Sequence, residues 1–299
     1  MRIAAWLLAA ALASVTSVAA AQSRTALEAG ARQVTIPVRE ASGKEARMVV
    51  TWFLPPGKGP FPVVLFSHGR PPGSAGRGKL ALGVSRSQLR YWLDKGVAVV
   101  SPLRPGYGAS TGGDVEQSGV RHDAAGHCLR TPDYRKTADA AVLSIRAALA
   151  WTQAQPWADA RDVLLVGQSV GGLSTVAAAA QSLPGVVGFI NFAGGSGGNP
   201  ERTPGVSCDP DQIKAMFAGY GRTTTVPSLW IYAMNDQYWG ADVPVAWHAA
   251  FAQGGSRTTF VHAPAVADGD GHGLSRHDPA LWAPAVDAFV SGLHLLPPH

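Results

Sequence analysis

Short apolar runs alternate with longer segments of helical periodicity along most of this chain. Residues 34–38 and 48–53 alternate between apolar and polar positions, which predicts an antiparallel hairpin. Nearly continuous apolar runs, typical of buried strands, follow at 61–66, 97–100, 163–166, 187–192, 228–233 and 258–261. Helical patterns lie between or after these runs, at 88–94, 134–155, 170–181, 243–252 and 279–293. This order predicts an α/β fold with a mostly parallel sheet of about eight strands, helices on both faces and a ligand site at the carboxyl ends of the strands.

One strand-to-helix junction carries a chemical signature. The run 163–166 continues into Gly167-Gln168-Ser169-Val170-Gly171, and a helix of small residues follows directly. This arrangement is typical of a nucleophile elbow, in which glycines let the backbone turn sharply and the serine hydroxyl stands above the sheet. Ser169 is therefore the candidate nucleophile.

The bare Gly-x-Ser-x-Gly pattern is not specific in a chain with 35 glycines, and it occurs twice more. The match at Ser110 leads into Gly-Asp-Val-Glu, which gives no clear helix start. The match at Ser196 leads into Asn199-Pro200, a turn signal. Only Ser169 has a predicted strand before it and a predicted helix after it, although such an elbow also occurs in scaffolds without activity.

These motifs resemble the α/β-hydrolase superfamily, over essentially the whole chain after residue 21. The run 61–69, which ends in Ser-His-Gly, and the run Arg104-Pro-Gly-Tyr-Gly108 are similar to those of dienelactone-hydrolase-like and prolyl-oligopeptidase-like esterases. The resemblance implies an α/β-hydrolase fold and hydrolysis through a serine, an acid and a histidine in that chain order. Ser169 stands where dienelactone hydrolases carry cysteine, which keeps ester chemistry and leaves lactone specificity open.

A serine hydroxyl needs a general base, and the base needs an acidic partner that orients it. Asp236 follows the apolar run 228–233 downstream of Ser169, where the resemblance places the acid. Its alternatives are Asp242, Asp270 and a purely structural role for Asp236 in an Asn-Asp turn.

The polar segment after the last predicted strand supplies the candidate base. His272 lies between glycines, which make the loop pliable enough to bring an imidazole over the elbow. His277, near the start of the final helical pattern, and His262, at the end of the strand, are the alternatives.

The tetrahedral intermediate of such a reaction needs N–H donors for its oxyanion. The backbone N–H groups of Val170, at a helix start, and of Arg70, in the loop after 61–66, are the candidates. We expect Tyr107, Tyr238 and Trp239 to line the substrate site, although Tyr107 in a glycine turn is also typical of packing. His68 is interpreted as a residue that shapes its loop, as in the resembling esterases.

The N-terminal segment and the two cysteines indicate export. Residues 1–21 have an early charge, an apolar stretch and a small-residue end, typical of a signal peptide cut after Ala21, with a membrane anchor as the alternative. Residues 22–299 are predicted to form one catalytic domain. In an oxidising compartment Cys128 and Cys208 can form one disulfide, the alternative being two buried thiols, and their surroundings predict no metal site.

The combined prediction is a secreted or periplasmic serine esterase that needs no cofactor. The formal charge of +5 is spread without a basic run, so no nucleic-acid partner is expected. No insertion long enough for a large lid is visible, which favours small or extended esters, from small molecules or polymers. A serine peptidase or thioesterase of the same fold is one alternative, and a catalytically silent binding protein is the other. Composition and motifs do not indicate which oligomeric state the protein adopts.

Overall fold

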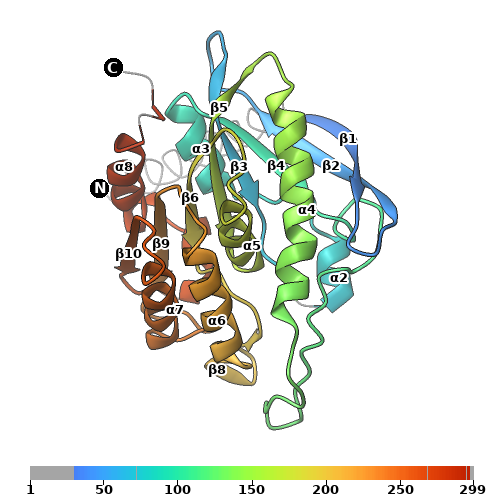
Figure 1. Ribbon diagram of the computed structural model, residues 1–299, viewed down its shortest axis with the longest axis vertical. Coiled ribbons are helices and arrows are strands. Elements are labelled where there is room, and N and C mark those ends of the chain that lie inside the picture. The colour runs from blue at the N-terminus through green and yellow to red at the C-terminus, as the bar shows by residue number, and fades with distance from the viewer. Residues whose placement is uncertain (1–29, 72, 268, 294, 297–299) are drawn as a thin grey trace, which may run out of the picture.

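The computed structural model describes residues 30–71, 73–267, 269–293 and 295–296; the expected signal peptide at 1–21 lies outside them. Eight strands form one sheet in the order β1-β2-β4-β3-β5-β6-β9-β10 (Figure 1). The strands are β1 (Arg32–Arg39), β2 (Glu45–Phe53), β3 (Phe61–Ser67), β4 (Ala98–Leu103), β5 (Ala158–Gln168), β6 (Val186–Phe192), β9 (Ser228–Ala233) and β10 (Thr258–Ala263). The predicted mostly parallel sheet is confirmed.

Strand direction follows the sequence patterns. The alternating segments β1 and β2 pair antiparallel, and β2 also pairs antiparallel with β4. All pairings from β4 to β10 are parallel. The chain moves from β3 outward to β4 and then returns to β5 on the other side of β3, so β3 and β5 flank a topological switch point. Ligands of open α/β sheets bind beside such a point, at the carboxyl ends of the strands.

Helices cover both faces of the sheet because each sheet face is apolar. The helices are α2 (Gly73–Gly78), α3 (Arg86–Asp94), α4 (Tyr134–Gln153), α5 (Val170–Ala179), α6 (Pro210–Gly221), α7 (Asp242–Ala252) and α8 (Ala283–Ser291). One core cluster packs α4, α5, α6 and α7 on one face, and the other packs α3 and α8 on the opposite face. Figure 1 shows α4 crossing in front of the sheet and α8 at its β10 side. None of the helices described is both long and apolar enough to cross a membrane.

The structure corrects the helix predicted over 279–293. A short 3₁₀ helix, η2 (Pro279–Leu281), is followed by Trp282, and α8 starts only afterwards, at Ala283. Pro284 in the first turn of α8 has no N–H to donate to an upstream carbonyl, so the helix cannot run through continuously. The structure also adds α2, α6, the hairpin of β7 (Gly198–Asn199) and β8 (Thr203–Ser207), and the 3₁₀ helix η1 (Gly271–Arg276), none of which the sequence patterns predicted.

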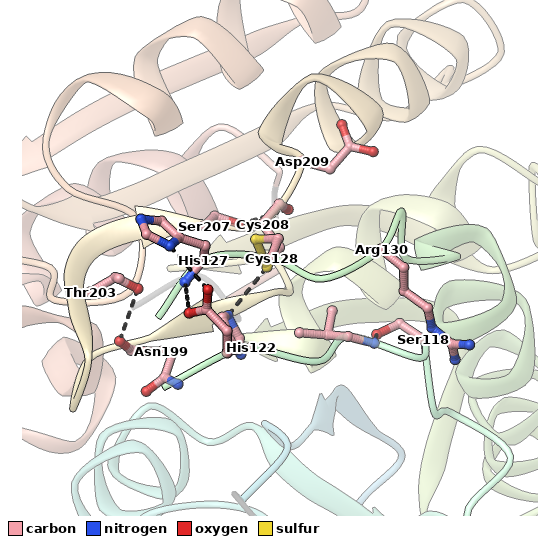
Figure 2. The surroundings of a disulfide bond; sticks show 12 residues. Ser118, His122, His127, Cys128, Arg130, Asn199, Thr203, Ser207, Cys208 and Asp209 are labelled. Carbon is pink, nitrogen blue, oxygen red and sulfur yellow. Dashed lines mark hydrogen bonds and ion pairs between the residues drawn. A yellow bond between two sulfur atoms is a disulfide. The ribbon is translucent and has the colours of Figure 1, made fainter. Parts of the chain in front are cut away.

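A disulfide joins Cys128 to Cys208, so the structure contains the predicted bridge. Figure 2 shows it linking the segment before α4, which carries His122 and His127, to the end of the β7-β8 hairpin, which carries Ser207. His122 Nε2 lies 3.2 Å from Cys208 Sγ. Because both sulfurs are used in the disulfide, neither is a thiolate ligand for a metal.

Replacing both cysteines by serine is expected to destabilise the fold strongly. The bridge closes a loop of sequence separation 80, for which the chain-entropy relation gives a loss of about 4.5 kcal/mol in the free energy of unfolding. Urea unfolding followed by circular dichroism measures this loss. Wild-type protein unfolded in the presence of a thiol reductant is the control, because it should lose a similar amount. Equal midpoints for the oxidised wild type and the double variant would contradict the prediction.

Candidate active site

Ser169 lies at the junction of β5 and α5, at the switch point of the sheet. Its backbone has φ 59° and ψ −126°, a conformation that non-glycine residues rarely adopt. Strained backbone conformations of this kind cluster at functional sites. Its N–H donates to Phe192 O at 3.0 Å, which extends the β5-β6 pairing up to the turn. The sharp turn lifts the side chain above the carboxyl ends of the strands.

Two glycines of the motif are required by space. A Cβ on Gly171 would overlap Ser67 O of β3, and a Cβ on Gly167 would overlap Gly171 O. The start of α5 can therefore lie against the end of β3 only because these positions lack side chains. This contact is what brings the elbow next to the loop that follows β3.

The structure brings Ser169, His272 and Asp236 together. His272 Nε2 lies 2.9 Å from Ser169 Oγ, and His272 Nδ1 lies 3.1 Å from Asp236 Oδ2. All three side chains are buried, with residue exposures of 8% for Ser169, 5% for His272 and 2% for Asp236. The other carboxylate oxygen, Asp236 Oδ1, accepts the backbone N–H groups of Tyr238 at 2.8 Å and Trp239 at 3.1 Å. These bonds fix the carboxylate, and the carboxylate fixes the imidazole.

Several contacts that the sequence analysis missed hold His272 in place. Asp270 Oδ1 accepts the N–H of His272 at 2.9 Å and the N–H of Gln237 at 2.9 Å, and it thereby caps η1. The amide of Gln168, which precedes the serine, donates to His272 O at 3.0 Å. The ring of Tyr238 stacks on the imidazole with centroids 3.9 Å apart. The Asp-Gly-His spacing is a local signal for the cap, whereas the other two contacts join distant segments.

The alternative acids and bases lie elsewhere. Asp242 is exposed at the start of α7, and Asp270 is occupied by the two backbone N–H groups. His277 lines a separate cavity beside α3, and the exposed His262 on β10 packs near Phe260.

Both candidate oxyanion donors lie beside Ser169. Val170 is the first residue of α5, where backbone N–H groups have no partner within the helix. Arg70 follows Gly69, whose Cα lies so close to the elbow that a Cβ there would stand 3.2 Å from Ser169 Cβ. Neither N–H has a backbone acceptor among the residues that the structure describes. Both therefore remain free to bind an anionic oxygen.

Two clefts meet at Ser169. One has a volume of about 290 Å³ and is lined by His272, Gln168 and Arg276 together with apolar residues such as Leu82. The other, of about 220 Å³, is lined by Val170, Gly195, Ser196 and Trp239. Arg70 and Tyr238 border both clefts. Of the residues expected to line the substrate site, Tyr238 thus borders both clefts and Trp239 borders the smaller one.

Tyr107 does not lie where it was expected. It lines neither cleft, is buried at 1% exposure, and donates its hydroxyl to Glu116 Oε2 at 2.6 Å. Burial, reinforced by the charge of Glu116, raises the pKa of Tyr107. The Tyr107 hydroxyl therefore does not face the substrate clefts. It is held in a buried polar cluster by Glu116, a residue of the same β4–α4 connection for which the sequence patterns predicted no role.

Comparison with known proteins identifies the fold. No protein-family description and no curated protein sequence matches the chain. Among solved structures, an esterase of Pyrococcus furiosus matches with a TM-score of 0.56 and 12% identity, over 88% of this chain and 91% of that one. Acetyl xylan esterase 1 from Thermoanaerobacterium sp. matches with a TM-score of 0.54 and 16% identity, over 89% of this chain and 84% of that one.

A peptidase shares the same architecture. The acylaminoacyl peptidase of Pyrococcus horikoshii matches with a TM-score of 0.56 and 14% identity, over 87% of this chain but only 42% of the peptidase. Identities this low show a shared fold and leave the chemistry to the site. The chain has the α/β-hydrolase fold, as the resemblance implied.

Proposed function

We propose that this chain is a serine hydrolase that cleaves carboxylic esters through an acyl-enzyme intermediate. One observation carries the proposal: a continuous hydrogen-bonded series runs from Ser169 Oγ through His272 to Asp236, at the meeting point of two clefts. Such a series is the arrangement that activates a serine hydroxyl at neutral pH. The esterase and peptidase structures with the same fold are consistent with this class of chemistry.

In the proposed first step, His272 Nε2 takes the proton of Ser169 Oγ while the oxygen attacks the ester carbonyl carbon. The imidazolium that forms is stabilised by Asp236, which accepts the Nδ1–H. The carbonyl oxygen becomes an oxyanion and accepts hydrogen bonds from the N–H groups of Val170 and Arg70. These donors cost no reorganisation because the backbone already holds them.

The tetrahedral intermediate then collapses to the acyl-enzyme. His272 Nε2 returns its proton to the departing alkoxide oxygen, so the alcohol leaves neutral and Ser169 Oγ keeps the acyl group. Water attacks the acyl carbon with the same base and the same donors, and the carboxylic acid is released.

The position of His272 orients the substrate. The leaving oxygen must lie within reach of His272 Nε2, so the alcohol part occupies the larger cleft, which His272 lines. The acyl part occupies the smaller cleft beside Val170 and Trp239. We also propose that the protein is exported, because the leader-like residues 1–21 and the disulfide both fit an oxidising compartment.

We expect the protein to hydrolyse soluble short-chain nitrophenyl esters faster than emulsified long-chain triglyceride. The smaller cleft has space for a short acyl chain, and a long chain would leave apolar surface in water. We expect kcat/KM to fall at least about tenfold from butyrate to dodecanoate. Hydrolysis of the ester series with a matched thioester and a matched anilide measures both the acyl profile and the bond class.

Covalent labelling distinguishes the proposal from its alternatives. A fluorophosphonate should add its phosphonyl mass to the peptide that contains Ser169. If Ser169 is labelled but the anilide or the thioester is cleaved faster than the ester, the protein would be a peptidase or a thioesterase of the same fold and not an esterase. If the folded protein shows no labelling and no turnover, the result would favour a catalytically silent binding protein.

A further inference from the structure

A buried arginine lies directly behind the loop that carries one candidate oxyanion donor. Arg104 follows β4 and is 1% exposed, and its guanidinium pairs with Glu116, which is 2% exposed. A second guanidinium nitrogen, Nη1, donates to His68 O at 2.7 Å and to Ser67 Oγ at 3.2 Å. A buried charge of this kind is costly unless it is fully paired. The cost of burying Arg104 beside residues 67–70 therefore indicates a specific role for it there.

Arg104 also fixes the protonation of His68. The backbone N–H of Arg104 donates to His68 Nε2 at 3.2 Å, and His68 Nδ1 lies 2.7 Å from Gly69 O. An N–H only donates and a carbonyl only accepts, so the imidazole is neutral with its proton on Nδ1. Burial and the positive charge of Arg104 lower the pKa of His68, which keeps it neutral at physiological pH. His68 therefore donates to Gly69 O.

The bond to Gly69 O determines the direction of the next N–H. Gly69 C=O and Arg70 N–H belong to one planar trans peptide, in which the two groups point to opposite sides. Anchoring the carbonyl on His68 consequently turns the Arg70 N–H away from His68. We propose that Arg104 is a positioning residue, which acts through His68 and the His68 carbonyl to hold the Arg70 N–H toward the oxyanion; this inference rests on the proposed function.

The surrounding cluster holds Arg104 and the loop from several sides. Glu116 Oε2 accepts the Tyr107 hydroxyl, and Thr137 Oγ1 on α4 donates to Glu116 O at 2.7 Å. The side chain of Arg70 joins the same cluster through a 3.1 Å hydrogen bond to the Tyr107 hydroxyl, and it donates two hydrogen bonds of 2.6 Å to Asp114. Although partial burial acts in the opposite direction, these bonds keep the pKa of Asp114 below its usual value. The donor peptide is thus fixed through its carbonyl and through the following side chain.

Replacing Arg104 by methionine tests the inference, since methionine fills much of the space and keeps the backbone N–H that bonds His68 Nε2, but removes the guanidinium bonds to His68 O and Ser67 Oγ. We expect kcat on nitrophenyl butyrate to fall about 10- to 100-fold, because a complete loss of one oxyanion donor costs about 10²- to 10³-fold, while KM changes less than about threefold. Binding of a trifluoromethyl ketone, whose adduct with Ser169 places an oxyanion in the hole, should weaken by a similar factor. Binding of butyl nitrophenyl ether, in which a CH₂ group replaces the ester carbonyl and no oxygen reaches the oxyanion donors, should not weaken. Arg104→Lys, which keeps the charge and one donor group, should recover part of kcat.

A matched core variant separates positioning from general destabilisation. Val142→Ala makes a cavity in the α4 core and should lower stability with no change in kcat or ketone binding. If Arg104→Met does not fold, Arg104→Lys and Glu116→Gln provide the same comparison, with smaller expected losses. Folded Arg104 variants with wild-type kcat and ketone affinity would overturn the inference and leave the esterase proposal standing. Inactive wild-type protein would instead reject the proposed function and, with it, this inference.

Discussion

Ser169→Ala is expected to lower kcat on nitrophenyl butyrate by at least about 10⁴-fold, since without the hydroxyl no acyl-enzyme can form. The fold should survive, because Ser169 Oγ contacts only His272 among the hydrogen-bond partners in the described chain. The melting temperature should therefore stay within a few degrees of the wild type. Steady-state kinetics, together with loss of fluorophosphonate labelling, measures the effect.

Ser110, which lies in another Gly-x-Ser-x-Gly match, provides the control. Ser110 Oγ donates to Leu103 O at 2.6 Å and accepts the N–H of Val49 at 2.9 Å, so it links the end of β4 to β2. Ser110→Ala should cost about 1–3 kcal/mol of unfolding free energy by leaving buried groups unpaired, and it should keep kcat near the wild-type value. A Ser169→Ala protein that retains its rate would show that another group is the nucleophile.

Period and length of the apolar runs were sufficient to predict the main sheet. Each predicted strand lies within or overlaps an observed one, because buried parallel strands are apolar throughout and differ clearly from amphipathic helices. The patterns failed where local signals conflicted. In α6 the apolar face of Ile213, Met216 and Phe217 follows Asp209-Pro210, which is typical of a turn but serves here as a helix cap.

The small elements near the site were beyond local prediction for a different reason. The helix α2 is glycine-rich and buries none of its residues, so its sequence has no apolar period. The hairpin β7-β8 is held by the disulfide from Cys208 to a segment 80 residues away. Neither feature has a sequence pattern of its own: α2 has no apolar face, and a distant contact holds the hairpin.

The candidate site shows the same division. The elbow at Ser169 has a local signature, and chain order in the resembling family pointed to Asp236 and His272, which the structure places in contact. Arg104 and Glu116 lie 12 residues apart in the connection between β4 and α4, which has no periodic pattern that would pair them, and both residue types are common at surfaces. Sequence alone therefore indicated which residues carry the chemistry but not which residues hold them.

Asp236→Asn is expected to lower kcat about 10⁴-fold, the loss known for the corresponding change in a serine protease triad. Asn Oδ1 can still accept the N–H groups of Tyr238 and Trp239, so the loop should keep its shape. The amide NH₂ would then face His272 Nδ1, and a donor there forces Nδ1 to become an acceptor. The proton moves to Nε2, where it removes the base that Ser169 needs. Kinetics on nitrophenyl butyrate, with the melting temperature as a check on folding, measures the loss.

Asp270→Asn is the matched comparison, because Asp270 also contacts His272 but bonds only backbone N–H groups in the described structure. Asn Oδ1 can accept both, so kcat should fall less than about tenfold. A tautomer effect predicts a large difference between the two variants, whereas a general need for negative charge near the imidazole predicts similar losses. Similar losses would mean that Asp236 acts mainly by its charge, and the orienting role assigned to its Oδ2 would be wrong.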